Sequence, residues 1–256
     1  MNMIKKISTL LSVILLLGIL TGTTYANETL NYEGTTVDKS TLSSDTIEWL
    51  EWYNALSPGE QDCINYVPYE LRKQSRTGVT VEEASPESGI RNALRANLLP
   101  LSGGEAAYDP SYWNHSSRIK KANCYAYAMD VICATDMKLQ PGELAGSTWT
   151  ALTASNIINA AKKDGPYLGN GRTLVTTNAN STSTNKSYKV ALVLGSNDYH
   201  WYVQNSDGYW SHKPGQTNAT DVDASGNYIT DPKTCNRAYS YENYSTWGGY
   251  LMVTRK

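Results

Sequence analysis

Three side chains in this sequence could together perform nucleophilic chemistry: Cys124, His200 and His212. The apolar stretch Asn123–Cys133 predicts a short helix with Cys124 at its start, where the helix dipole and the unpaired amides lower the pKa of a thiol. A thiolate is a nucleophile, a neighbouring imidazole completes its activation, and a second polar group orients that imidazole. The pattern predicts Cys124 as the nucleophile, His200 as base and then acid, and His212 as the orienting residue.

The two histidines depend on a turn for their proximity. His200 opens one predicted strand, His212 lies on the next, and residues 205–208 (NSDG) connect them. A three-residue loop with Gly208 in the left-handed conformation places Tyr202 opposite His212, and the histidines become diagonal neighbours on one face. A two-residue loop would put them on opposite faces. The predicted histidine pair therefore depends on the turn type.

Two stretches carry a resemblance to a known superfamily. The segment NCYAYAM around Cys124 resembles the cysteine helix of CHAP amidases, and HWYVQNSDGYWSH around His200 and His212 resembles the strand–turn–strand unit of NlpC-type peptidases. Both belong to the papain-like cysteine hydrolases. The resemblance covers residues 110–255. One departure is Asn123-Cys124-Tyr125, where NlpC peptidases usually carry Asp-Cys-Ser.

The resemblance implies a secreted cysteine peptidase or amidase that hydrolyses peptide or amide bonds, with peptide or peptidoglycan as substrate. The Cys124 amide and the Asn123 side chain could supply an oxyanion hole. Tyr125, Tyr202 and Trp210 crowd the site and are the predicted substrate-binding rings. No metal and no cofactor is required by this mechanism. For the orienting role, the alternatives to His212 are Asp207, Gln204 and Asn205.

The N-terminal part of the chain predicts helices. In Asp45–Leu56 the apolar residues recur at i, i+3, i+4 and i+7, which is one face of a helix. A second helix begins after Ser57, where a capping box and a proline at the first helical position coincide, and is predicted to reach Gln74. The composition of residues 77–89 is typical of a linker.

The remaining elements predict an α+β fold. A helix is expected over Thr148–Lys163, followed by an antiparallel meander. The strands are predicted at Arg172–Thr177, Ser187–Gly195, Tyr199–Gln204, Tyr209–Lys213 and Tyr250–Arg255. With the resemblance, this becomes a papain-like fold of helices packed on an antiparallel sheet.

Three regions divide the chain. Residues 1–26 have the charged start, apolar core and small-residue end of a secretory signal peptide, with cleavage expected after Ala26. The apolar core is too short to span a bilayer, so no transmembrane anchor is expected. Residues 27–90 are a helical N-terminal extension or a pro-segment, and residues 91–256 form the papain-like domain. The protein is therefore expected to be secreted.

Composition narrows the function classes. The formal net charge of −2 leaves no basic surface of the kind that nucleic-acid binding requires. The chain has no Phe but 19 Tyr and 7 Trp, so every large aromatic carries a polar group. Such rings are also typical of glycan-binding surfaces. Two alternatives therefore stay open: a non-catalytic glycan-binding module, and a secreted toxin or effector that uses the same cysteine–histidine chemistry on a host protein.

The cysteine count leaves the disulfide pattern open. The four cysteines are Cys63, Cys124, Cys133 and Cys235. Cys124 and Cys133 could not pair if they share one helix, because nine residues of helix separate them by about 13 Å. Two disulfides, or one disulfide with a reactive thiol and a bystander, both fit a secreted protein.

Overall fold

The computed structural model describes residues 28–72, 78–85 and 98–256. The predicted signal peptide and its cleavage site lie outside these residues, as do residue 77 and residues 86–89 of the predicted linker. The described part of that linker contains a strand, residues 81–83, that pairs with residues 131–133. The helices are α1 (Ser44–Ala55), α2 (Pro58–Cys63), α3 (Tyr69–Arg72), α4 (Pro110–Trp113), α5 (Cys124–Ala128) and α6 (Ala154–Asp164). The strands are β1 (Thr29–Tyr32), β2 (Thr35–Asp38), β3 (Val81–Glu83), β4 (Val131–Cys133), β5 (Arg172–Thr177), β6 (Ser187–Leu194), β7 (Tyr199–Gln204), β8 (Trp210–His212) and β9 (Thr246–Arg255).

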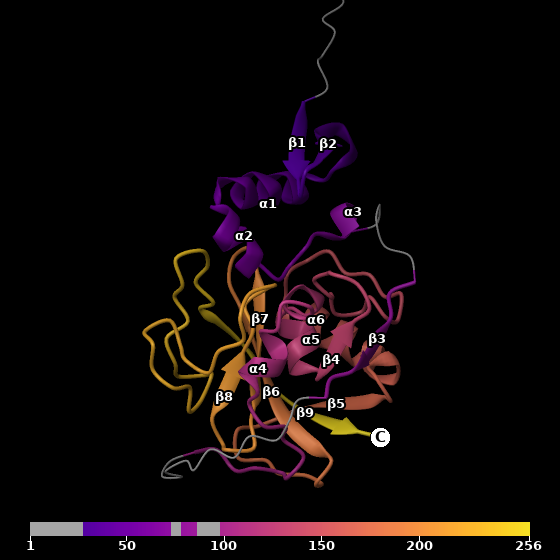
Figure 1. The fold of residues 1–256 in the computed structure, drawn as a ribbon. Coiled ribbons are helices and arrows are strands. Elements are labelled where there is room, and N and C mark those ends of the chain that lie inside the picture. The colour runs from indigo at the N-terminus through magenta and orange to yellow at the C-terminus, as the bar shows by residue number, and fades with distance from the viewer. Residues whose placement is uncertain (1–27, 73–77, 86–97) are drawn as a thin grey trace, which may run out of the picture.

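The main body, residues 98–256, is built on a five-stranded antiparallel sheet with the order β5-β9-β6-β7-β8. The predicted α+β class and antiparallel pairing are confirmed. The predicted simple meander is wrong, because the last strand of the chain, β9, lies between β5 and β6 (Figure 1). A contiguous meander is confirmed only for β6-β7-β8.

Both faces of the sheet are covered. Along β7, Trp201 and Val203 pack in the larger core with α5 and α6, while Tyr202 packs in a smaller core on the opposite face. This alternation follows the period of two along a strand. The second face is covered by the long connection between β8 and β9, drawn in gold in Figure 1. Every residue of β6 and β7 is buried as a result, including the polar residues His200 and Gln204.

Residues 28–72 form an N-terminal arm that sits over one end of the main body (Figure 1). Its helix α1 is capped by Ser43, and the predicted apolar face is confirmed, because Trp49 and Tyr53 are buried. The indole nitrogen of Trp49 donates to the Asn197 carbonyl oxygen at 2.9 Å, which joins the arm to the turn before β7.

The predicted long second helix is wrong. The capping box at Ser57 is present, but α2 ends at Cys63, residues 64–68 are neither helix nor strand, and a separate single turn, α3, begins at Tyr69. Pro68 disfavours a helical conformation at the residue before it. In addition, the backbone amides of residues 65 and 66 bind a buried carboxylate of the main body instead of helix carbonyls.

Two further elements differ from their predictions. Helix α5 ends at Ala128, because Asp130 takes a left-handed conformation (φ 56°) and the chain turns into β4. Cys124 and Cys133 therefore do not share a helix, and all four cysteines are free thiols in this structure. Helix α6 begins six residues later than predicted, because Thr153 is extended and its side chain accepts from the Asn156 amide as the cap.

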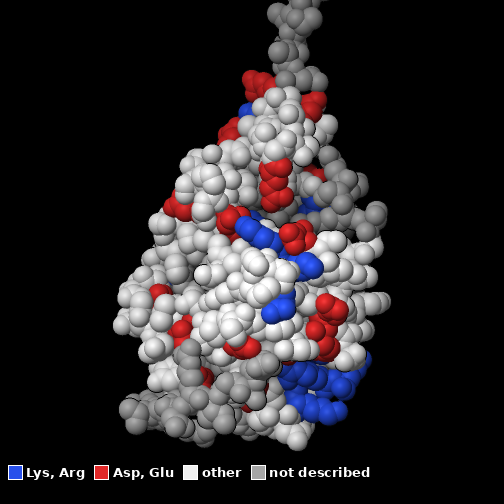
Figure 2. Space-filling model, viewed as in Figure 1, with Lys and Arg blue, Asp and Glu red and all other residues white. Residues whose placement is uncertain are grey.

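The charges on the molecular surface are unevenly placed. Figure 2 shows acidic side chains on the arm and a group of Lys and Arg side chains towards the opposite end of the same face. Within the described part of the chain, no helix has the length and hydropathy needed to cross a membrane.

Candidate functional site

Cys124 is the first residue of α5, as predicted. Asn123 is the N-cap: its side-chain oxygen accepts from the Ala126 amide at 3.3 Å, and its side-chain nitrogen donates to the Leu139 carbonyl oxygen at 3.0 Å. Both ends of the Asn123 carboxamide are therefore engaged in holding the helix start and the 139–140 loop. Its predicted role in an oxyanion hole stays a prediction, since nothing in its contacts tests it.

The two histidines meet as predicted. The turn is the three-residue loop, because Gly208 has a φ of 91°, the Asn205 amide donates to the Tyr209 carbonyl oxygen, and Tyr202 pairs with His212. His200 Nε2 lies 2.8 Å from His212 Nδ1, and the rings are nearly perpendicular. His212 Nε2 lies 3.0 Å from the Val222 carbonyl oxygen. The sequence therefore predicted this pair correctly.

A third residue, Asn65 of the arm, completes the cluster and was missed by the sequence analysis. Its side-chain oxygen accepts from the backbone amides of Cys124 (3.1 Å) and Gly215 (3.0 Å). Its side-chain nitrogen lies 3.2 Å from His200 Nδ1 and donates to Asp198 Oδ2 at 3.1 Å. Asn65 therefore links the start of α5, the loop after β8 and the start of β7. The only sequence signal for it was Pro68, which argues against helix at this point.

These contacts assign the protons. The Asn65 amide nitrogen can only donate, so His200 Nδ1 accepts and its Nε2 carries hydrogen. That hydrogen is donated to His212 Nδ1, and His212 Nε2 donates in turn to the Val222 carbonyl oxygen. One chain of hydrogen bonds runs from the arm through both rings, and it requires both imidazoles to be neutral.

Asp198, also missed by the sequence analysis, anchors the arm. Its carboxylate accepts from the backbone amides of Asn65 and Tyr66 and from the hydroxyl of Tyr244 at 2.7 Å. Asp198 is fully buried, and burial raises the pKa of its carboxyl to about 6, against the lowering effect of these hydrogen bonds. The carboxyl is one residue from β7, so the arm is held directly beside His200.

The predicted activation of Cys124 differs from what its surroundings produce. Cys124 has no exposed surface, and burial raises the pKa of its thiol well above the ordinary value, with the charge of Asp198 adding to that rise. The direction is opposite to the one predicted from the helix dipole, because five residues of helix do not offset complete desolvation. Burial and the charge of His212 hold the pKa of His200 well below its ordinary value. The Cys124 thiol and the His200 imidazole are therefore both favoured in their neutral states.

The predicted substrate-binding rings are inside the protein. Tyr125, Tyr202 and Trp210 each have no exposed surface. The Tyr125 hydroxyl donates to Asp164 Oδ2 at 3.0 Å in the core, while Tyr202 and Trp210 pack in the smaller core. The arrangement of the site is therefore a closed polar centre, formed by Asn65, Cys124, Asp198, His200 and His212. We refer to these five residues as the polar centre.

A buried lysine supports one wall of this centre. Lys213 Nζ donates to the carbonyl oxygens of Ile119, Ala122 and Gly215. Burial lowers the pKa of its ammonium to about 7. These bonds fix the loop that presents the Gly215 amide to Asn65, because they tie it to the segment that leads into α5.

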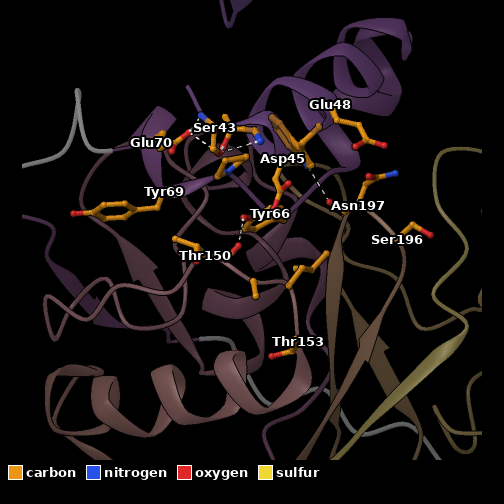
Figure 3. Close-up of a pocket in the computed structure, with 15 residues that line it drawn as sticks. Ser43, Asp45, Glu48, Tyr66, Tyr69, Glu70, Thr150, Thr153, Ser196 and Asn197 are labelled. Carbon is orange, nitrogen blue, oxygen red and sulfur yellow. Dashed lines mark hydrogen bonds between the residues drawn. The ribbon is translucent and has the colours of Figure 1, made fainter. Parts of the chain in front are cut away.

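An open groove lies at another part of the boundary between arm and main body (Figure 3). It has a volume of about 540 Å³ and is lined by α1, α3, residues 150–153 and the turn before β7. Asp45, Glu48 and Glu70 stand at its rim, and the buried rings of Trp49 and Tyr66 form part of its wall. Glu70 accepts from the amide and hydroxyl of Ser43, which joins α3 to the start of α1.

Comparison with known proteins finds a relative that is not named as a hydrolase. No protein-family model matches the chain, and no solved structure matches it. Insoluble matrix shell protein 1 of Ruditapes philippinarum is 31% identical over 143 residues, which is 56% of this chain and 88% of that protein. This chain belongs to the family of insoluble matrix shell protein 1. The alignment covers 88% of the relative, so the similarity is to nearly its whole length and not to one short segment.

Membership of the insoluble matrix shell protein 1 family corrects the predicted function. The prediction of a cysteine hydrolase is wrong, because the relative is named as an insoluble matrix protein of a shell. A peptide or peptidoglycan substrate is likewise unsupported. The papain-like resemblance and the roles predicted for Cys124, His200 and His212 have no match that tests them. A relative from a shell matrix is consistent with the predicted secretion.

Proposed function

We propose that this protein is a secreted structural component of an extracellular matrix. The observation that carries the proposal is the 31% identity to insoluble matrix shell protein 1, which extends over 88% of that relative. The predicted signal peptide, residues 1–26 with cleavage after Ala26, supplies the export that this role requires. Mass spectrometry of the secreted protein, with Asn27 as the expected first residue, tests the cleavage site.

The polar centre supports a structural role. A cysteine nucleophile needs a thiolate, or an imidazole that removes its proton. Here the pKa of Cys124 is raised and the pKa of His200 is lowered, and both side chains are at most 1% exposed. We therefore propose that the papain-like arrangement of helix start and strand pair serves as a scaffold. In this proposal Cys124, His200 and His212 hold the arm and the loop after β8 together.

Fractionation of the extracellular material of the source organism tests the proposed role. Antibodies against the protein are used to follow it through extraction with water, with salt and with denaturant. The expected result is retention in the water- and salt-insoluble fraction and release by denaturant. Recovery of most of the protein as a freely diffusing species in the medium would overturn the proposal.

A substitution separates a structural from a catalytic role. The Cys124→Ala variant is expressed in the source organism and followed through the same fractions. A matrix role predicts the same distribution as the wild-type protein, because Cys124 is a packing residue in this proposal. A loss of retention in the folded variant would count against it. Tyr167→Ala is the matched control, because Tyr167 is exposed and far from the polar centre in sequence.

A further inference from the structure

The five residues of the polar centre are not equivalent: one of them comes from a different part of the molecule. Cys124, Asp198, His200 and His212 belong to the main body, whereas Asn65 belongs to the arm. Four groups of the main body contact the Asn65 side chain, and one group of the arm, the Cys63 carbonyl oxygen, lies 3.4 Å from its nitrogen. The arrangement therefore has the form of a binding site with a ligand in place.

The walls are matched to a primary carboxamide. Two backbone amides, of Cys124 and Gly215, donate to the Asn65 oxygen at 3.1 and 3.0 Å. Two acceptors of the main body, Asp198 Oδ2 and His200 Nδ1, face its nitrogen at 3.1 and 3.2 Å, and the Cys63 carbonyl oxygen of the arm is a third at 3.4 Å. A carboxylate would place a second oxygen against the Asp198 carboxylate, and an ammonium would face two N–H donors. Only a group with an acceptor and a donor side by side satisfies all four walls.

The main body also binds the backbone around Asn65. The Asn65 amide donates to both oxygens of Asp198, and the Asn65 carbonyl oxygen accepts from Gln140 Nε2 at 2.7 Å. The amide of the next residue, Tyr66, also donates to Asp198. These contacts fall in residues 64–68, which are neither helix nor strand, and Ile64 begins this segment with an extended backbone (φ −70°, ψ 135°).

We propose that the main body carries a binding site for an asparagine carboxamide in a peptide segment that is neither helix nor strand, and that Asn65 is its resident ligand. The site closes over Cys124 and His200, which are at most 1% exposed, so occupancy by the arm also keeps the thiol away from solvent. This inference does not depend on the proposed matrix role, because it concerns contacts within one chain.

Chemical rescue of Asn65→Gly tests the proposal. The substitution removes the carboxamide and leaves a space of its shape, so the melting temperature is expected to fall. Acetamide, which supplies the missing group, is expected to raise it again in a saturable manner, by about 3 °C or more. Acetate and N,N-dimethylacetamide are expected to have no such effect, since one lacks the donor and the other blocks it.

Two controls separate site binding from general effects of the additive. Leu50→Ala destabilises the arm through a buried apolar residue with no polar contact, and acetamide is expected not to raise its melting temperature. Acetamide is also expected to slow the labelling of Cys124 by N-ethylmaleimide in Asn65→Gly. The proposal is overturned if acetamide gives no rescue, or if acetate or dimethylacetamide rescues equally.

Two measurements keep the test decisive if Asn65→Gly does not fold. Acetamide in the refolding buffer is then expected to raise the folded yield of Asn65→Gly and not of Leu50→Ala. Asn65→Asp exchanges only the NH₂ group for oxygen and leaves no space. At pH 7 it is expected to lower the melting temperature by at least as much as Asn65→Gly. A wild-type melting temperature in Asn65→Asp would show that the donor side of the carboxamide is not recognised.

Discussion

The polar centre and the open groove are both formed where the arm meets the main body, but the polar side chains are buried in the first and several are exposed in the second. In the polar centre Asp198 and His200 are buried, and each is hydrogen-bonded within the protein. In the groove Asp45 and Glu48 are exposed to solvent, and Asp45 accepts from the Ser44 hydroxyl at 3.4 Å. The comparison predicts that the buried hydrogen bonds of the polar centre stabilise this boundary more than the exposed carboxylates of the groove do.

The largest effect is expected from Asp198→Ala. The substitution leaves the backbone amides of Asn65 and Tyr66 buried without an acceptor, so the free energy of unfolding is expected to fall by about 3 kcal/mol or more. Urea unfolding followed by tryptophan fluorescence measures it. Asp45→Ala in the groove is the matched control and is expected to change stability by less than about 0.5 kcal/mol. Equal losses of stability in Asp198→Ala and Asp45→Ala would contradict the prediction that the polar centre stabilises the boundary more than the groove does.

The second largest effect is expected from His212→Gln, which changes how the free energy of unfolding depends on pH. Burial lowers the pKa of His212 to about 4, from an ordinary value of 6.5. The unfolded state therefore binds this proton first, and the contribution of His212 is complete above pH 6.5 and is lost as the pH falls towards 4. In His212→Gln the fall in the free energy of unfolding between pH 7 and 4.5 is expected to be smaller by about 2 kcal/mol.

The difference between the pH profiles of the wild type and His212→Gln reports the contribution of His212 alone. Burial also raises the pKa values of Asp198 and Asp164 to about 6. A raised carboxyl pKa acts in the opposite sense, because stability then increases as the pH falls from 6 towards 3.8. Both carboxyls are present in the wild type and in His212→Gln, so their effect cancels in the difference. Parallel pH profiles of the two proteins would contradict the neutral histidine pair.

Thiol labelling gives the third test. Cys124 is fully buried with a raised pKa, whereas Cys63 is partly exposed. In the native protein at pH 8.5, iodoacetamide is expected to label Cys63 at least about tenfold faster than Cys124. Peptide mass spectrometry measures the two rates, and labelling in denaturant provides the reference for full accessibility. Fast labelling of Cys124 at mildly acidic pH would instead indicate an activated thiol and an open centre.

The smallest effects are expected in the groove. Glu70 accepts from the amide and hydroxyl of Ser43, so Glu70→Ala is expected to cost about 1 kcal/mol of stability, as for a lost helix-cap interaction. Glu48 is exposed at the same rim, and Glu48→Ala is expected to change stability by less than about 0.5 kcal/mol. Thermal unfolding of both variants measures the order. A larger effect for Glu48→Ala would show that contacts other than the Ser43–Glu70 hydrogen bonds stabilise the rim of the groove.

Local patterns determined much of the main body. The strands predicted at residues 172–177 and 199–204 coincide with the observed bounds of β5 and β7. Gly208 in a three-residue turn fixed the register that brings His200 and His212 together. The Asn123 cap placed Cys124 at a helix start. Each of these features depends on residues close together in the sequence.

Only the tertiary structure decided what this arrangement does. Asn65 lies 59 positions before Cys124 and 135 before His200, so no local pattern could place it between them. The same long-range packing buried the thiol and reversed the direction of its pKa shift, because desolvation by the whole fold outweighs the dipole of a five-residue helix. The sequence determined which groups are adjacent along strands and turns, and tertiary burial decided which of them carry charge and which meet solvent.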